Sequence, residues 1–358
     1  MNYMDIIDMQ HSSKWYEVVT SFQQYDVYYL QNYVKAYMIH GDGIPYLIYY
    51  NSKHLRGINV VMKRDISEFG PLKSIIKSGS CYDLSTPYGY GGFIFEGDTS
   101  EKEMEQFYDS CFELANSQNV ISMFTRFHPL LNNVEVMRSK SFIVDLGKTI
   151  AMDLESDEVI WSNFTPNNRN NVRKAERFGV KIVHGKSLDL LYRFMEIYND
   201  TMKKEVANPY YFFEREFYQS IHTDLYDHYE VFYAVLEDKI ISMAIMIFAN
   251  HRMHCHFLGS IYEYRNYAPN NLLFYEAARW GCKEGFKTMH IGGGVGSSDD
   301  SLYRFKKSFN RNSDHVFSIG KRIYNQEIYD YLVDMRKKSD PTFDASSGFF
   351  PLYRARNY

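Results

Sequence analysis

Apolar and polar positions along the chain follow two periods, which predict a succession of helices and short strands. Apolar residues three or four positions apart mark amphipathic helices, for example within residues 100–120 and 187–204. Short apolar runs broken by polar turns predict hairpins, with one turn at residues 51–53 and another at residues 237–239. Helices and strands are interspersed throughout, so the pattern favours a protein that mixes both.

The order of these predicted elements occurs twice. Each half reads as a helix, a hairpin, a strand, a tyrosine-rich loop, a second helix and a further strand. A recurrence in fixed order indicates a duplicated structural unit. Here the order of the elements repeats, whereas the amino-acid sequence itself does not. We therefore expect two domains, residues 1–150 and residues 151–358.

A polar helix is predicted between the two halves by "TPNNRNNVRKAERFGVKI". Thr165 is suited to the N-cap, Pro166 to the first helical position and Gly179 to the residue after the end. Spacing by four residues places three arginines on one face of this helix: Arg169, Arg173 and Arg177. Such a stripe either contacts phosphate groups, as in tRNA, or is an ordinary solvated face.

A second helix start lies in "FLGSIYEYRNYAPNNLLF". Either Asn270 or Asn271 is expected to cap the helix, after a strand that ends at Gly259 and Ser260. The N–H groups at the helix start would suit a pyrophosphate or a carbonyl that gains negative charge. The alternative is that this is a plain helix cap, since every helix needs one.

Further along, "GGGVG" and "SLYRFKKSF" follow a predicted strand. The glycine run lacks the helix that a dinucleotide-binding fingerprint requires directly after it. Tyr303 could return a proton to a leaving group and Lys306 could hold a phosphate, although the same stretch also fits an amphipathic helical turn. The histidines of "HRMHCHF" have no second ligand pair, so no metal is expected.

Composition limits the partners. A net charge of −4 gives no general basic field, so a nucleic acid would need a local patch. Four scattered cysteines predict no disulfide framework and favour a reducing cytoplasm. The sequence shows neither a signal peptide nor an apolar run of membrane-spanning length. We expect a bacterial cytoplasmic protein, with peripheral attachment at the inner face of the membrane as a variant of that expectation.

Several segments, in this order, resemble the FemAB/FemX-type branch of the GNAT N-acyltransferase superfamily. They are "NNRNNVRKAERFGVKI", "FLGS", "APNNLLFYEAARWGCKEGFKTMHIGGG" and "LYRFKKSF", and "DLSTPYGYGG" and "MFTRFHPLLNN" in the first half are similar to acetyltransferase-like members. The resemblance implies an α+β fold of tandem GNAT-like domains, each a mixed, mostly antiparallel sheet flanked by helices. It also implies acyl transfer to an amine by direct attack.

The resemblance also suggests roles for individual residues. Lys306 matches a lysine near the transferring group, and Tyr303 lies near a general-acid tyrosine. The residues implied in donor binding are Gly259, Ser260, Asn270, Asn271, Leu272, Gly292 and Gly293. Those assigned to the acceptor are Tyr88, Tyr90, Arg126 and His128. The long loop after Ser260 has no glycine, unlike the CoA-binding loop of ordinary GNAT enzymes, and no coiled-coil arm is present.

Three hypotheses about function follow from these features. The first is an N-acyltransferase that uses acetyl-CoA or another acyl-CoA on an amine of a cell-envelope precursor, such as a nucleotide- or lipid-linked amino sugar. The second is an aminoacyl-tRNA-dependent, FemX-like enzyme acting on a peptidoglycan precursor or muropeptide, which the arginine stripe favours. The third is a GNAT-like protein that binds such a ligand without catalysis.

Overall fold

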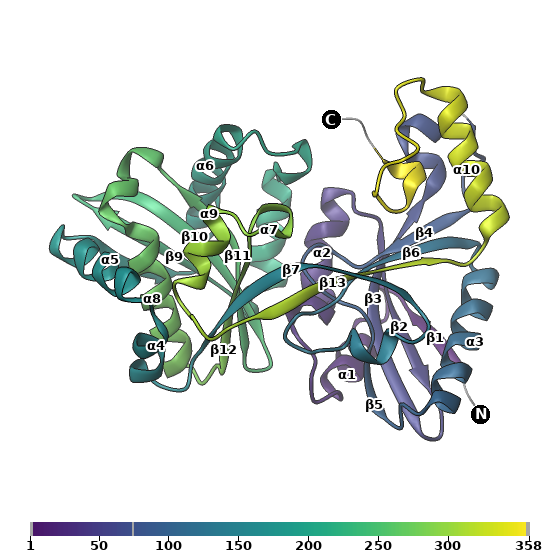
Figure 1. The fold of residues 1–358 in the computed structure, drawn as a ribbon, viewed down its shortest axis with the longest axis horizontal. Helices are drawn as coiled ribbons and strands as arrows, with labels where there is room; N and C mark the ends of the chain where they lie inside the picture. The colour runs from purple at the N-terminus through teal and green to yellow at the C-terminus, as the bar shows by residue number, and fades with distance from the viewer. Residues whose placement is uncertain (1–2, 74, 356–358) are drawn as a thin grey trace. The chain divides into compact units, whose positions relative to one another are not determined.

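A computed structural model of the protein describes residues 3–73 and 75–355, which fold into two compact units. Unit 2 is the continuous segment Leu146–Phe317, whereas unit 1 combines the chain up to Asp145 with the chain from Ser318 onward (Figure 1). Both units mix helices with a sheet, which confirms the predicted α+β class. No helix within the described ranges is long and apolar enough to cross a membrane.

Unit 1 is built on the strand order β1-β2-β3-β4-β6-β13, and β5 pairs with β3. Its strands are β1 (Tyr3–Ile7), β2 (Ile44–Asn51), β3 (Leu55–Asp65), β4 (Tyr82–Ser85), β5 (Ile94–Gly97), β6 (Val120–Arg126) and β13 (His315–Ile323). Its helices are α1 (Ser12–Thr20), α2 (Gln31–His40), α3 (Glu101–Ser117) and α10 (Gln326–Ser339).

Unit 2 has the strand order β8-β9-β10-β11-β12-β7. Its strands are β7 (Phe142–Asp153), β8 (Lys181–Gly185), β9 (Tyr229–Leu236), β10 (Lys239–Ala249), β11 (Arg252–Ser260) and β12 (Thr288–Gly293). Its helices are α4 (Asp157–Asn163), α5 (Pro166–Arg177), α6 (Leu188–Lys204), α7 (Arg215–Asp224), α8 (Pro269–Lys283) and α9 (Ser301–Lys307).

The strand orders of the two units have the same topology, so the predicted repeat is confirmed. In each, neighbouring strands are antiparallel except for one parallel pair, β4 with β6 in unit 1 and β11 with β12 in unit 2. A helix connects each parallel pair, as a parallel connection requires. The last strand in each order is not part of the repeat. In the sequence, β7 comes before the repeated segment of unit 2, and β13 comes after the repeated segment of unit 1.

This last strand explains where the second domain ends. β13 pairs with β6, from Ile319 opposite Arg126 to Ile323 opposite Ser122. The chain from Ser318 onward therefore belongs to unit 1, whereas the sequence expectation assigned all of residues 151–358 to one C-terminal domain. The difference arises because strand pairing over a long separation leaves no local signal in the sequence.

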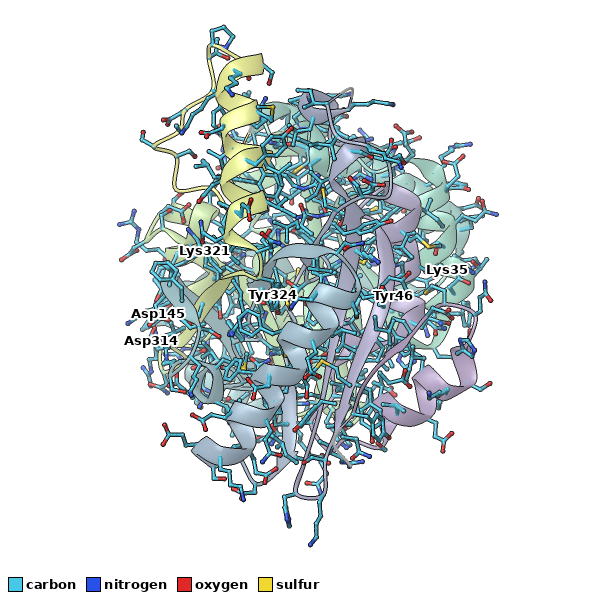
Figure 2. All side chains as sticks on the ribbon, turned by 90° about the vertical axis from the view of Figure 1, so that its right-hand side faces the viewer. Lys35, Tyr46, Asp145, Asp314, Lys321 and Tyr324 are labelled. Carbon is cyan, nitrogen blue, oxygen red and sulfur yellow. The ribbon has the colours of Figure 1, made fainter. Side chains whose placement is uncertain are left out.

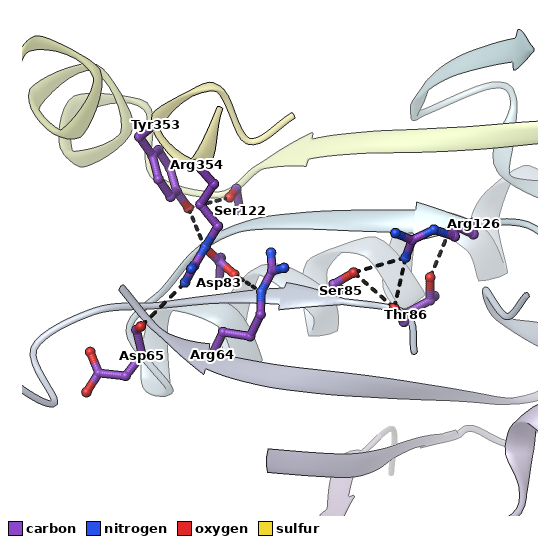
Figure 3. A network of polar contacts seen from close by, with 9 residues as sticks. All are labelled: Arg64, Asp65, Asp83, Ser85, Thr86, Ser122, Arg126, Tyr353 and Arg354. Carbon is purple, nitrogen blue, oxygen red and sulfur yellow. Dashed lines mark hydrogen bonds and ion pairs between the residues drawn. The ribbon is translucent and has the colours of Figure 1, made fainter. Parts of the chain in front are cut away.

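The C-terminal segment is attached to unit 1 by a buried ionic network. Asp83 is fully buried, and its Oδ1 accepts a hydrogen bond of 2.6 Å from Arg64 Nε. Its Oδ2 accepts from Arg354 Nε and, at 3.1 Å, from the hydroxyl of Tyr353 (Figure 3). Burial alone would raise the pKa of Asp83, but the two guanidinium groups hold it below its ordinary value. The carboxylate thus fixes the chain end onto strand β4.

Helix α3 covers the apolar face of the sheet in unit 1. Met104, Phe107 and Cys111 of α3 are buried against residues of β2, β3 and β4. Tyr46 and Tyr324, which Figure 2 labels, pack against the edge of the same cluster. The amphipathic helix predicted at this position is therefore confirmed as a core helix.

The sheet of unit 2 is covered on both faces. Helix α8 packs with Phe274, Ala277 and Ala278 into the main apolar cluster of this unit, next to α5. Helices α6 and α7 pack on the other face, where Phe257 of β11 contacts the rings of Phe194 and Phe217. The two layers fix the ends of β11 and β12, from which the candidate site is built.

The predicted start and end of α5 are confirmed. The hydroxyl of Thr165 accepts a hydrogen bond from the backbone N–H of Asn168, and Pro166 occupies the first helical position. The chain leaves the helix at Gly179, whose φ of +80° is easily adopted only by glycine. Local capping rules were sufficient at this helix.

Candidate functional site

The parallel strands β11 and β12 are paired over only part of their length. Their register runs from Arg252 opposite Thr288 to His254 opposite His290. Beyond that point the ladder to β10 shifts by one residue at His256, and the ladder from β12 to β7 shifts at Ile291. Each shift is a β-bulge, which bends its strand. The two strands therefore separate, and the opening between their ends is the centre of the candidate site.

Helix α8 begins beside this opening in a way that corrects the predicted cap. Its N-cap residue is Ala268, in a left-handed conformation (φ 55°, ψ 42°), and Pro269 follows at the first helical position. No side chain in the described residues caps this helix. Asn270 and Asn271, expected as caps, bond elsewhere, so the positive end of the helix dipole has no side-chain oxygen over it.

The side chain of Asn270 belongs to a small polar network at the end of β11. Its Oδ1 accepts hydrogen bonds from Ser242 Oγ at 2.6 Å and from Ser260 Oγ at 3.0 Å. Thr201 joins them, because its hydroxyl accepts from the backbone N–H of Ser260 at 3.0 Å. The predicted residues Ser260 and Asn270 are therefore brought together, whereas Leu272 is buried in the core of the unit.

A pocket of about 330 Å³ opens at the start of α8. Ser260, Asn270 and Asn271 form its polar wall, and Phe305 lies opposite as part of the helix that carries Lys306. Lys204, Glu205 and Arg265 also line it. The Nζ of Lys204 lies 3.5 Å from Glu263 Oε1, and the Arg265 guanidinium lies 3.7 Å from the centre of the Tyr262 ring. A helix start with two nearby cations suits a ligand that carries a phosphate or another anion.

Gly259 packs closely against helix α6. A Cβ atom at this position would lie 2.9 Å from both the Cα and the backbone N of Tyr198 in α6. The glycine thus lets β11 and α6 approach closely, which is a packing reason for this residue beside the predicted role in donor binding.

Substitution of Gly259 by alanine is expected to cost about 1–3 kcal/mol of unfolding free energy, because backbone atoms of α6 must move. Chemical denaturation measures this loss. Gly185→Ala is the matched control, since a Cβ there meets only the Leu190 Cδ1 atom at 3.6 Å. A stable Gly259→Ala protein that fails to bind donor would instead support the ligand role.

Lys306 lies on α9, and its side chain reaches the end of β12. Its Nζ donates a hydrogen bond of 2.8 Å to the backbone oxygen of Gly293, and a Cβ on Gly292 would lie 3.1 Å from the same Nζ. Within the described residues no carboxylate forms an ion pair with it. Burial lowers its pKa, and the nearby Cys255 and Asp300 offset only part of this effect. The predicted Gly292, Gly293 and Lys306 therefore do lie together.

Tyr303 is half-buried on the same helix, three residues before Lys306. Burial raises the pKa of its hydroxyl, so the phenol is protonated at neutral pH. Asp300 is the N-cap of α9, accepting from the backbone N–H groups of Tyr303 at 2.8 Å and Val295 at 3.0 Å. Its carboxylate is thus used for capping.

Cys255 and His256, which the sequence alone did not assign to the site, lie at the point where β11 bends. Burial raises the pKa of the Cys255 thiol to about 12 and lowers the pKa of His256 to about 3. Both groups are therefore uncharged at neutral pH. The spacing of "HRMHCHF" resembles a metal motif, and the bulge at His256 has no local sequence signal.

No covalent acyl-cysteine is expected at this site, because a thiol with such a high pKa is a poor nucleophile. Incubation of the protein with an acyl donor and no acceptor should leave the intact mass of the protein unchanged in mass spectrometry. A mass increase of one acyl group located on Cys255 would contradict direct attack.

The three arginines of the predicted stripe on α5 lie in different environments. Arg169 is half-buried and donates from Nη1 to the backbone oxygens of Phe164 at 2.8 Å and Trp161 at 3.2 Å. Arg173 lies over the ring of Trp161, at 5.2 Å from its centre, and Arg177 is exposed. Only the outer part of the stripe is available to a ligand, since Arg169 closes the end of α4.

The predicted acceptor residues lie in unit 1, where Tyr90 and His128 contact each other. Their ring centres are 5.7 Å apart, and His128 Nε2 lies 3.0 Å from Asp26 Oδ2 in a fully buried pair. Tyr88 stacks instead on Tyr37, at 5.7 Å.

Arg126 has a structural contact of its own in unit 1. Its Nη1 donates to the backbone oxygen of Thr86 at 3.2 Å, at the end of β4. Thr86 is the first residue after β4 and precedes the tyrosine- and glycine-rich loop. The structure thus groups the four predicted acceptor residues around one loop of unit 1, with Arg126 at its base.

Comparison with known proteins supports the interpretation of this geometry. Residues 162–307 match the family model of the acetyltransferase (GNAT) domain. No curated protein matches the chain. Among solved structures, FemX shares 14% identity and a TM-score of 0.66, over 91% of this chain and 99% of FemX.

Two further solved structures have the same general fold. The C-terminal domain of a putative lysylphosphatidylglycerol synthetase from Agrobacterium fabrum has 12% identity and a TM-score of 0.52, over 91% of this chain and 95% of that domain. A tandem GNAT protein from the clavulanic acid biosynthesis pathway has 7% identity and a TM-score of 0.50, over 90% and 99%.

These matches define the class of the protein. Unit 2 contains a GNAT acyltransferase domain, and it includes the opening between β11 and β12, the start of α8 and Lys306. The whole chain shares its fold with FemX and with a tandem GNAT protein. The resemblance seen in the sequence is thus confirmed, as is the assignment to acyltransferases.

Proposed function

We propose that the protein transfers an acyl group, such as acetyl, from a CoA thioester to an amine of a cell-envelope precursor, such as an amino sugar. The observation that carries this proposal is the pocket at the uncapped start of α8, which adjoins the helix of Lys306. The donor phosphates would lie against the helix start, Arg265 and Lys204. The protein would act in the cytoplasm or at the inner face of the membrane.

The reaction would proceed by direct attack of the neutral amine on the thioester carbonyl. The new C–N bond forms, the C–S bond breaks, the amine loses a proton to solvent and the leaving thiolate takes one from the Tyr303 phenol. Lys306, as a cation in a poorly solvated opening, would stabilise the negative charge on the carbonyl oxygen in the transition state. Tyr88, Tyr90, Arg126 and His128 of unit 1 stay the predicted acceptor residues.

An aminoacyl-tRNA donor is the second candidate, and one surface of unit 2 favours it. Phe178, at the end of α5, is half exposed and packs edge-on against Tyr267, with ring centres 5.0 Å apart. Arg177 is the residue before it, and Tyr262 with Arg265 lies in the same loop as Tyr267. Exposed rings and cations of this kind bind the bases and phosphates of single-stranded nucleic acid.

Isothermal titration with coenzyme A, acetyl-CoA and aminoacylated tRNA, each at low and moderate salt, tests the proposal. Micromolar binding of coenzyme A that weakens in Arg265→Ala supports a thioester donor. Binding of only the charged tRNA, with an affinity that falls steeply as salt increases, would transfer the proposal to the second donor. Binding of neither would contradict the assignment of the pocket to a donor.

A further inference from the structure

We propose that Asn168 and Asn271 form a positioning pair, which holds the start of α8 and the helix of Lys306 in a fixed arrangement. The catalytic consequence rests on the proposed function of this site, whereas the mechanical coupling does not. Neither asparagine is assigned a chemical step. Their role is to keep the pocket and the lysine in register with each other.

The pair arises from a short sequence that occurs at two helix starts. Helices α5 and α8 both begin with Pro-Asn-Asn, at residues 166–168 and 269–271, with the proline in the first helical position. The third residue of each motif points to the other helix. Asn271 Nδ2 donates to Asn168 Oδ1 at 2.7 Å, and the two residues are 7% and 0% exposed.

Asn168 extends the connection to α9. Its Nδ2 donates to the backbone oxygen of Ser308 at 3.3 Å, and the same oxygen accepts from the backbone N–H of Thr165 at 2.9 Å. Ser308 is the C-cap of α9, two residues after Lys306. Two successive hydrogen bonds therefore lead from Asn271, which lines the pocket, to the end of the helix that carries the lysine.

Packing alone does not explain why two asparagines occupy this apolar position. Phe164, Phe274 and Phe309 are fully buried close by, with ring centres of 5.2–5.4 Å between neighbours. Apolar side chains would fill such a space without the cost of burying two amides. Hydrogen-bonded amides add direction, because only one mutual arrangement of the helices satisfies them. Such directional bonds would hold the start of α8 and the helix of Lys306 in one arrangement.

The other asparagine of each motif serves as an internal comparison. Asn167 is exposed, whereas Asn270 bonds to Ser242 and Ser260 at the end of β11. Asn167→Ala is thus a matched control for Asn168→Ala, with the same change at the neighbouring position of the same motif.

The test uses the titration of Lys306, which requires no donor or acceptor. The Nζ of Lys306 faces the Gly293 oxygen, with Cys255 and Asp300 nearby, and burial lowers its pKa. We expect the pKa measured by NMR of the lysine side chain to rise toward the ordinary value of 10.5 in Asn168→Ala and Asn271→Ala. It should not change in Asn167→Ala. An unchanged pKa in both buried variants would overturn the coupling.

A destabilised control separates positioning from general loosening. Ile221→Ala removes a buried side chain of α7, on the other side of the sheet of unit 2. It should lower the melting temperature at least as much as Asn168→Ala and leave the pKa of Lys306 where it was. An equal change of the Lys306 pKa in Ile221→Ala would show that the asparagine pair is only a packing contact.

Kinetics then connect the coupling to catalysis. Asn168 does not line the pocket, so Asn168→Ala should lower kcat by roughly ten- to a hundredfold with little change in the KM for the donor. An unchanged kcat together with a shifted Lys306 pKa would refute the catalytic consequence alone. Failure of every donor to bind the wild type would refute the proposed function and leave the pKa result standing.

Discussion

Replacement of Lys306 by methionine is expected to remove most acyl transfer while the protein stays at least as stable as the wild type. Loss of one group that stabilises transition-state charge typically lowers kcat by about 10²–10³-fold. The buried ammonium of Lys306 has one hydrogen-bond acceptor, the Gly293 oxygen, and no ion-pair partner in the described residues. An apolar side chain of similar length avoids the cost of burying that charge.

The lowered pKa of Lys306 also predicts the direction in which the stability of the protein changes with pH. Folding lowers the pKa of Lys306 below its ordinary value of 10.5, so the folded protein releases this proton before the unfolded chain does. The stability of the wild type relative to Lys306→Met should therefore rise as the pH increases from the folded pKa to the ordinary one. Denaturation curves between neutral and alkaline pH measure it.

Lys307→Met is the matched control for this substitution. Lys307 is the next residue of α9 and also donates to a backbone oxygen, that of Ser313. We expect this variant to retain transfer activity and to lose some stability, which is the opposite pattern. Equal activity losses in the two variants would show that Lys306 has no special part in the reaction.

Replacement of Asp83 by asparagine is expected to destabilise unit 1 by about 3–5 kcal/mol. The carboxylate is completely buried and contacts both Arg64 and Arg354, so its loss leaves two guanidinium groups without their counter-ion. Urea denaturation measures the change. Asp334→Asn, which disrupts an exposed pair with Lys337, should stay within about 0.5 kcal/mol of the wild type.

Acid titration distinguishes this ionic network from simple packing. The pKa of Asp83 lies below its ordinary value of 3.8, so its contribution is complete above the ordinary pKa and declines as the pH falls through the folded one. The stability gap between the wild type and Asp83→Asn should therefore close in strong acid. A gap that stays constant down to the acid unfolding of the protein would contradict the ionic origin.

Features that depend on neighbours in the sequence were predictable. The start of α5 at Pro166 and its end before Gly179 follow from residues that act on their own backbone. The repeated order of elements was visible for the same reason, because each helix and hairpin has its own period. The placement of Gly292 and Lys306 together follows from the short connection between β12 and α9.

Features that depend on distant partners were not predictable. Asn270 was expected to cap its helix, but Ser242, on another strand, takes up its side-chain oxygen. Gly259 lies against the backbone of Tyr198, a contact that no sequence signal indicated. β13 joins unit 1 through a pairing with β6 across most of the chain. In each case the deciding contact lies outside the window in which capping and periodicity act.

Transfer of a radiolabelled acyl group to amines is the most direct test of the central claim, that the opening in unit 2 is an acyltransferase site. Wild type and Lys306→Met would each be incubated with labelled acetyl-CoA or labelled aminoacyl-tRNA and a panel of amino sugars and muropeptides. We predict that the wild type forms a labelled amide from one donor and that Lys306→Met, equally folded, does not. Equal amide formation by both proteins, or none by the wild type with either donor, would contradict the claim.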